Sequence, residues 1–456
     1  MTIVMVSDKS FVPTFSKVGQ GLGVKPQGFC VIWLMKRVDV MSYIRENAVF
    51  PKMYRIEQHF SNEKVEDIKA EVYKQFDSVG LKAKIKPNGK IGITCGSRGI
   101  NNIDKIIKAA VDYVKDAGGE PFILPAMGSH GGATAEGQKH VCEKFGVSSE
   151  AMGCEIRSSM ETVILGKTVS GIDVNFDKNA YESDGVIVVN RVKRHTDFIA
   201  KNESGIVKML SVGLGKQKGA SAMHTNGLGK TIPETAEVIL KNAPILVGLG
   251  IVENAHEETY MLKAVEPENF IEEDAKLLEL SNSLVPALPC RDIDILIVKE
   301  MGKQYSGTGM DTKVIGRMKI FGEKEPDYPV VKKLVALRLS DASYGNALGI
   351  GLADLTVKKL VDSIDYEAMY SNLITTTFLE RGRVPVHFDT ERESIDVAFK
   401  TIGGVKPEDA RLMIIDNTLN IGTMLVSESI YNDIKDKVEL LEEDVKIEFD
   451  QNGVLK

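Results

Sequence analysis

The feature that most constrains the fold is a regular alternation of short apolar runs with amphipathic helix patterns, beginning near residue 62. The apolar runs lie at 91–95 (IGITC), 121–127 (PFILPAM) and 184–190 (DGVIVVN). The third is a compact β-branched run, which is typical of a buried parallel strand. Apolar side chains recur at helical spacing between charged ones within 62–76, 102–119 and 134–146. Because strand–helix–strand alternation builds a parallel sheet covered by helices, the pattern predicts an α/β fold.

A second set of elements follows the proline-containing segment 283–289 (SLVPALP). It contains two strand patterns and a helix pattern, at 293–300 (IDILIVKE), 411–416 (RLMIID) and 391–402 (ERESIDVAFKTI). We therefore place a boundary in 280–291 and expect two α/β domains with largely parallel sheets, 45–285 and 286–456, with an active-site cleft between them. Residues 1–44 are expected to be an N-terminal extension, to which we assign no function.

Composition excludes several classes of function. The net charge of −7 argues against a general nucleic-acid-binding protein, which usually has a basic surface. The longest apolar runs are too short to cross a bilayer, so we expect a cytoplasmic protein without a membrane partner. The five cysteines form no C-x-x-C pair, which argues against a disulfide framework and against a zinc or iron–sulfur site built from closely spaced thiolates.

Three predicted loops each carry one strongly polar residue directly after a strand. These residues are Arg98, His130 and His195. Ligands of open α/β sheets bind outside the carboxyl ends of the strands, so the three side chains are candidates for one site. Two histidines can serve as a proton donor and a proton acceptor near neutral pH, and an arginine fork matches a carboxylate or phosphate.

The segment 204–224 (SGIVKMLSVGLGKQKGASAMH) places His224 sixteen positions after Lys208. Apolar neighbours on both sides of Lys208 could shield its amine from water and make it a nucleophile, although a surface lysine extending toward solvent is the simpler interpretation. The two GLGK tetrapeptides could present Lys216 or Lys230 to a phosphate, or could be glycine turns with solvated lysines. The segment 224–231 (HTNGLGKT) lacks the first glycine of a P-loop, which excludes that class of ATPase.

The ordered set Arg98, His130, His195, Lys208 and His224 resembles the nickel-dependent lactate racemase family. The resemblance rests on the arginine loop, on the histidine loop SHGGATAEGQ, on a second histidine 65 positions later, and on SGIVK followed after sixteen positions by a histidine. The family carries a nickel-pincer nucleotide, a pyridinium mononucleotide with two sulfur-containing arms that hold nickel(II).

The resemblance implies a role for each of these residues. Lys208 would form the covalent link to the cofactor, and His224 would ligate nickel, for which soft sulfur and imidazole donors are suitable. His130 and His195 would flank a 2-hydroxy acid and exchange the proton of its hydroxyl group. Arg98 would hold the substrate carboxylate.

The resemblance implies racemisation or epimerisation of a 2-hydroxy acid, with cofactor-biosynthesis proteins as partners. The family also places a lysine early in its second domain, and Lys303, Lys313 and Arg317 are the local candidates for it. Two alternatives remain open. One is another hydride-shuttling enzyme that acts on a sugar acid or polyol, and the other is a nucleotide- or anion-binding protein of the same fold without catalysis.

Overall fold

The computed structural model describes residues 47–97 and 99–456, apart from the side chain of Thr375. Five strands form one sheet in the order β3-β2-β6-β7-β8. Their bounds are β2 (Lys90–Cys95), β3 (Glu120–Pro125), β6 (Gly185–Arg191), β7 (Ile245–Glu253) and β8 (Thr259–Val265). Neighbouring strands are parallel except for the antiparallel pair of β7 and β8. The predicted α/β class with a largely parallel sheet is therefore confirmed.

Helices cover both faces of this five-stranded sheet. The helices are α2 (Ile68–Ser78), α3 (Leu81–Lys84), α4 (Ile103–Asp116), α5 (Ala135–Lys144), α6 (Ser149–Met152), α7 (Lys178–Tyr181), α8 (Ile206–Lys208), α9 (Lys216–Asn226), α10 (Leu228–Asn242) and α11 (Phe270–Leu284). A small antiparallel pair, β4 (Thr162–Lys167) and β5 (Asp173–Asp177), lies beside α9 and α10. The helix predicted at 62–76 begins only at Ile68, because the Asp67 side chain accepts the backbone N–H of Ala70 at 3.0 Å and caps it.

The side chains of β6 alternate between two hydrophobic cores. Ile187 and Val189 pack into the core that contains α2 and α4, whereas Val186 and Val188 pack into the core that contains α10 and α11. This alternation is the period-two geometry of a strand buried on both faces. Because both faces of β6 are buried in apolar cores, the polar residues of this region lie in the loops beyond the ends of the strands.

A second sheet has eight strands in the order β12-β11-β10-β9-β13-β14-β1-β15. Their bounds are β1 (Met53–Glu57), β9 (Asp292–Met301), β10 (Val330–Leu339), β11 (Leu355–Val357), β12 (Val386–Phe388), β13 (Leu412–Ile415), β14 (Thr423–Ser427) and β15 (Glu439–Val445). The strands from β12 to β13 are parallel, and the other three pair antiparallel. Its helices are α12 (Lys358–Asp362), α13 (Tyr366–Thr376), α14 (Glu391–Thr401) and α15 (Glu428–Ile434).

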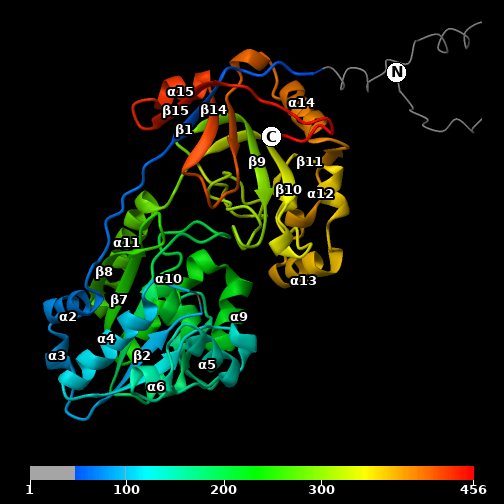
Figure 1. Ribbon diagram of the computed structural model, residues 1–456. Helices are drawn as coiled ribbons and strands as arrows, with labels where there is room; N and C mark the ends of the chain where they lie inside the picture. The colour runs from blue at the N-terminus through cyan, green and yellow to red at the C-terminus, as the bar shows by residue number, and fades with distance from the viewer. Residues whose placement is uncertain (1–46, 98) are drawn as a thin grey trace, which may run out of the picture. The chain divides into compact units, whose positions relative to one another are not determined.

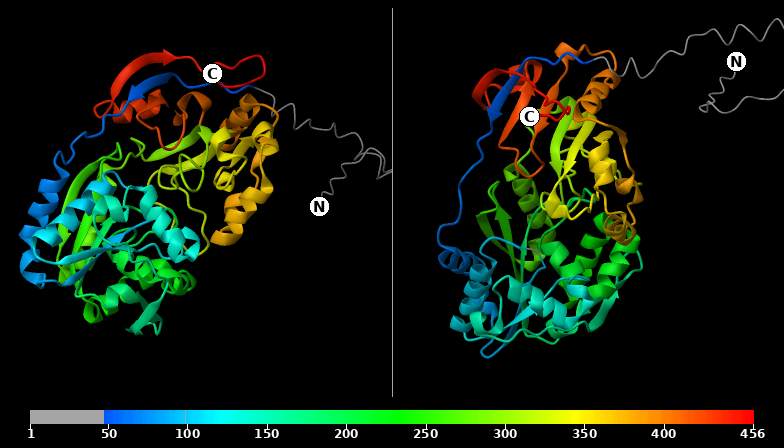
Figure 2. Two further views of the ribbon diagram at one scale, coloured as in Figure 1. Left: turned by 60° about the horizontal axis from the view of Figure 1, so that its bottom comes forward. Right: turned by 45° about the vertical axis from the view of Figure 1, so that its right-hand side comes forward.

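Strand β1 belongs to this second sheet, although all its other strands come after residue 291. Figures 1 and 2 show β1, in blue, between β14 and β15, in orange and red, and the register pairs Glu57 with Thr423 on one side and with Glu439 on the other. The chain therefore crosses from the second sheet to the first after β1 and returns at β9. The division into 45–285 and 286–456 remains a prediction, and this crossing shows that residues 53–57 pair with the later segment.

The expected N-terminal extension, residues 1–44, lies outside the described residues. Within the described part, no helix has both the length and the apolar character needed to cross a membrane.

Candidate functional site

Three loops meet at one edge of the five-stranded sheet. Since β3 and β6 both pair in parallel with β2, the residues that follow these three strands lie at the same edge. Ser97 follows β2 and His130 follows β3, and a hydrogen bond joins Ser97 Oγ to His130 Nδ1. His195 comes four residues after the end of β6. Arg98, predicted as the carboxylate-binding residue, lies outside the described residues.

Buried polar contacts fix the loop that carries His130. The Gln138 side chain is fully buried, and its Nε2 donates to the carbonyl oxygens of Gly128 at 3.0 Å and His130 at 3.2 Å. The imidazole of His130 itself is at an exposed position. The backbone of the loop is therefore fixed by Gln138, while the side chain of His130 remains accessible.

Lys216 is buried and forms an internal ion pair. Its Nζ lies 2.8 Å from Asp177 Oδ2, and both side chains have almost no exposed surface. The same amine donates to the Pro125 carbonyl at the end of β3 and lies 3.5 Å from Gln138 Oε1. Lys216 is thus a structural cation that connects the start of α9 to the His130 loop, not one presented to a phosphate. Lys230 of the second GLGK is exposed, 3.9 Å from Glu234.

Lys208 ends the short helix α8, whose start is held by a buried carboxylate. Asp274 on α11 accepts the backbone N–H of Ile206 at 2.7 Å and the amide of Asn202 at 3.0 Å. Asn190, at the end of β6, donates to the Gly205 carbonyl at 2.7 Å. After Lys208 the chain widens into a π-helical turn, Met209–Gly213, a geometry that is frequent at functional sites. The helix α9 then carries His224.

The loop that carries His195 is folded back on itself. Glu203, which is buried, accepts the backbone N–H groups of His195 and Ala200 through its two carboxylate oxygens. The His195 ring packs on Phe198 with centroids 4.6 Å apart, and Lys208 Nζ lies 5.9 Å from the centroid of the same ring. The Phe198 ring is therefore close to both a predicted proton-transfer residue and the predicted attachment residue.

Electrostatic effects show which predicted residues lie together. Burial lowers the pKa of His195 to about 3, and the positive charge of Lys208 adds to this effect. His224 lowers it further, whereas Asp197 opposes the shift. Burial and the charge of Lys208 also lower the pKa of His224. His224 is at an exposed position, but the protein around its ring still disfavours the charged form. Since such effects decline with distance, His195, Lys208 and His224 form one cluster.

The segment after β9 contributes a lysine to this cluster. Lys313 is half-buried, and burial lowers the pKa of its amine, with the nearby carboxylate of Glu203 opposing. Lys313 is also among the cations that lower the pKa of His195. Lys303 instead donates to Gly307 and Asn372, and Arg317 binds carbonyl oxygens and Asp354. Among the described interactions of the three candidates, that of Lys313 is the one that reaches His195.

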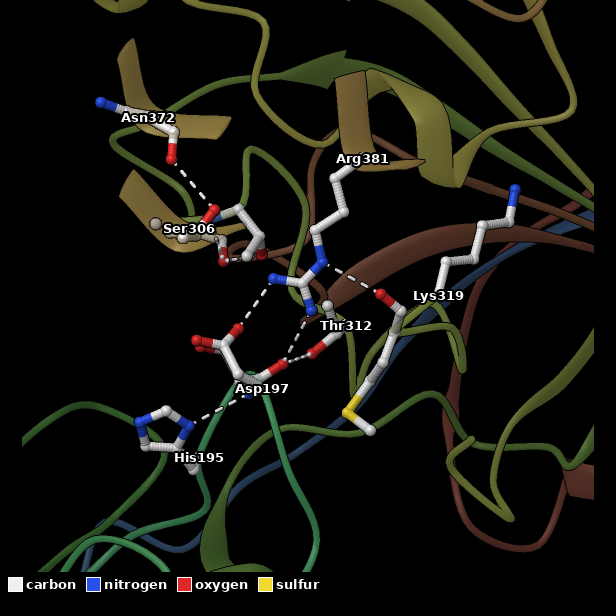
Figure 3. A network of polar contacts seen from close by, with 12 residues as sticks. His195, Asp197, Ser306, Thr312, Lys319, Asn372 and Arg381 are labelled. Carbon is white, nitrogen blue, oxygen red and sulfur yellow. Dashed lines mark hydrogen bonds and ion pairs between the residues drawn. The ribbon is translucent and has the colours of Figure 1, made fainter. Parts of the chain in front are cut away.

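Arg381 is a site residue that sequence reasoning missed. Its side chain is almost fully buried, and it forms an ion pair with Asp197, with Nη1 and Oδ1 2.7 Å apart. Figure 3 shows the guanidinium beside the segment that carries His195 and Asp197. Asp274 and Asp197 were also missed, because a single acidic residue in a helix or loop gives no sequence signal of what it contacts.

A second set of metal-competent side chains lies elsewhere. Ligand atoms of Glu57, His59 and Glu439 lie within 4.8 Å of one another. Glu57 and Glu439 are paired residues of β1 and β15, and His59 follows β1 by two residues. His59 Nε2 is 2.7 Å from Glu439 Oε2, which continues a row of exposed ion pairs between these strands, Lys52 with Glu443 and Arg55 with Glu442. Strand pairing explains this group without a metal.

A cavity in the first half of the chain is also separate from the histidine cluster. It has a volume of about 670 Å³ and lies between α2, α4 and the start of β8, with Lys64, Lys105, Lys108 and Glu258 in its wall. These three lysines contact Glu258, Asn102 and Asp112, respectively. None of His195, Lys208 and His224 lines this cavity.

Comparisons with known proteins give a family without an assigned function and two similar folds. Residues 85–270 match the family described as Domain of unknown function (DUF362). A solved structure from Thermotoga maritima is 14% identical with a TM-score of 0.48, covering 79% of this chain and 98% of that one. The lactate racemase apoprotein from Thermoanaerobacterium thermosaccharolyticum is 12% identical with a TM-score of 0.42, covering 76% and 86%. The chain has no match among curated proteins.

Proposed function

We propose that this protein is an isomerase that racemises or epimerises a 2-hydroxy acid with a covalently bound nickel-pincer nucleotide. The observation that carries the proposal is the cluster of His195, Lys208 and His224, for which the resemblance implies proton transfer, cofactor attachment and nickel ligation, respectively. A cytoplasmic location and dependence on cofactor-building proteins belong to the same proposal.

The residues of the cluster fit such a cofactor. A metal-binding imidazole must be neutral, and both burial and the charge of Lys208 favour the neutral form of His224. Lys208 is half-buried beside an aromatic ring, where a covalent link would be shielded on one side. Lys208 would hold the nucleotide and His224 would ligate nickel(II). When bound, this cofactor supplies a site that takes up and returns a hydride.

The remaining residues would bind the substrate and move its proton. Arg98 would hold the substrate carboxylate, as the resemblance implies. Lys313 would help to attract it, since Lys313 is a half-buried cation whose charge reaches His195. His130 is accessible and held through Ser97, so it can exchange a proton with a hydroxyl group from its side of the site. His195, kept neutral by its surroundings, would serve the other side.

Intact-protein mass spectrometry with nickel analysis tests the proposal, on full-length protein co-expressed with a cofactor-making pathway. We expect a covalent mass increase that maps to Lys208 and about one nickel per chain, as one attachment site and one ligand set require. Lys208→Ala should lose the adduct, and His224→Ala should lose nickel. Lys230→Ala and His140→Ala are controls, because both side chains are exposed and lie outside the cluster. Full cofactor loading of both site variants would refute the assignment.

A binding protein for nucleotides or anions is the second candidate, favoured by the concentration of Lys208, Lys313 and two histidines at the site. The two proposals differ in the effect of His130→Ala and His195→Ala. The first outcome is that the parent protein turns over a 2-hydroxy acid, a sugar acid or a polyol. If either variant abolishes this turnover but retains nickel, the result supports the isomerase or a hydride-shuttling relative. Unchanged ligand affinity in both variants, without turnover in the parent, supports the binding protein.

A further inference from the structure

The hydrogen bonds of His195 define which of its nitrogens carries a proton. The backbone N–H of Asp197 donates to His195 Nδ1 at 3.1 Å (Figure 3). A ring nitrogen that accepts a hydrogen bond has no proton, and a neutral imidazole then carries its proton on Nε2. In this arrangement Nε2 is a hydrogen-bond donor, which can neither ligate a metal nor accept a proton.

The short segment between His195 and Phe198 is tethered by residues far away in the sequence. Arg381 Nη1 donates to Asp197 Oδ1 at 2.7 Å, and Nη2 donates to the Thr196 carbonyl at 3.4 Å. Thr312 Oγ1 donates to the same carbonyl at 3.0 Å. Both residues that follow His195 are thus held from outside their own loop.

Arg381 is itself fixed in place. Its Nε donates to the Met318 carbonyl at 3.0 Å, its guanidinium lies 5.0 Å from the centroid of the Phe378 ring, and only 2% of its surface is exposed. An arginine fork that is held at three nitrogens has little freedom, so its position determines that of the Asp197 carboxylate. The Asp197 backbone N–H in turn determines the position of His195 Nδ1.

We propose that Arg381 is a positioning residue that, through Asp197, keeps His195 in the tautomer with its proton on Nε2. Resting on the proposed function, this assigns His195 the role of donating a hydrogen bond from Nε2 to the substrate at the start of the reaction, while His130 accepts the proton of the hydroxyl group. For His195 to take a proton at Nε2, its own proton must first move from Nε2 to Nδ1, and this requires that the Asp197 N–H leave Nδ1. The segment 195–197 is then the part of the site that has to move between the two directions of a racemisation.

The tautomer can be measured without cofactor or substrate, by NMR of the full-length protein labelled with ¹⁵N-histidine. The seven histidines give few signals, and His195→Gln identifies those of His195. In the parent protein we expect one protonated nitrogen, Nε2, and one unprotonated nitrogen, Nδ1. In Arg381→Met, both signals of His195 should move toward the averaged position of two exchanging tautomers, because the tether that aligns the Asp197 N–H is gone.

Arg317→Met is the matched control for the loss of a mostly buried arginine. Arg317 also pairs with a carboxylate, Asp354 at 2.8 Å, and donates to carbonyl oxygens, but it makes no described contact with the His195 loop. It should lower stability and leave the His195 signals unchanged. If Arg381→Met does not fold, Thr312→Val and Asp197→Asn weaken the same tethers while Arg381 stays in place.

Two results would overturn the proposal. One is a proton on Nδ1 in the parent protein, and the other is a set of folded tether variants whose His195 signals match those of the parent. Since neither result depends on an adduct at Lys208, failure of this inference and failure of the proposed function can be told apart.

Discussion

Gly205 and Asp274 are so close that a Cβ atom on Gly205 would lie 1.9 Å from Asp274 Oδ1. The backbone of Gly205 is extended, with φ −170°, so its conformation alone does not require glycine. The constraint is purely steric. The glycine of SGIVK leaves room for a buried carboxylate to reach the first backbone N–H groups of the helix that presents Lys208.

Gly205→Ala should therefore destabilise the protein and loosen α8. The added methyl group must push Asp274 away from Ile206, and overpacking of this kind typically costs about 1–3 kcal/mol. Urea denaturation measures this cost, and hydrogen exchange of the peptide spanning 206–214 should become faster. Gly229→Ala is the control, because its Cβ would meet Ala200 Cβ at an ordinary 3.4 Å. Equal stability of the two variants would show that Asp274 does not constrain position 205.

Asp274 should also make stability depend on pH. Burial raises the pKa of its carboxyl to about 6, while the hydrogen bonds from Asn202 and from the backbone of Val207 and Ile206 oppose the shift. The folded state therefore binds this proton more tightly than the unfolded state. Its contribution is fully present below the unfolded pKa of about 3.9 and is lost as pH rises through about 6, a change of at most about 3 kcal/mol.

Asp274→Asn removes this titration, and the free energy of unfolding of parent and variant should be compared from pH 4 to pH 7. The difference between them should shift in favour of the variant as pH rises, whatever the fixed cost of the amide beside Asn202 Nδ2. A difference that stays constant over this range would mean that Asp274 ionises normally in the folded protein.

The parts of the site that sequence analysis located are those encoded by local patterns. His195 was found because it follows a β-branched strand, and Lys208 and His224 because their spacing matches a family motif. The structure places these three within electrostatic reach of one another. Their chemical roles remain predictions, as does that of His130, which lies at the same edge of the sheet.

The parts that sequence analysis did not locate depend on contacts between distant segments. Arg381 pairs with Asp197 across 184 positions, and Asp274 binds the N–H of Ile206 across 68. Nothing near either residue specifies its partner, because the partner is set by how the elements pack. Strand β1 is a similar case: it pairs with strands more than 360 positions later, for example Glu57 with Thr423, and only the register of the assembled sheet reveals this.

The two lysines of the GLGK tetrapeptides should respond very differently to the same substitution. Lys216→Met would leave the fully buried Asp177 carboxylate without its cation, and breaking a buried ion pair from one side typically costs about 3–5 kcal/mol. Lys230→Met removes an exposed charge 3.9 Å from Glu234 and should stay within about 0.5 kcal/mol of the parent.

Urea denaturation of the two variants gives the comparison directly. The sequence context of the two lysines is nearly identical, so a large difference would come from burial alone. If Lys216→Met were as stable as Lys230→Met, Lys216 could not be the structural cation described for it. The interpretation of GLGK as a phosphate-binding turn would then apply to it again.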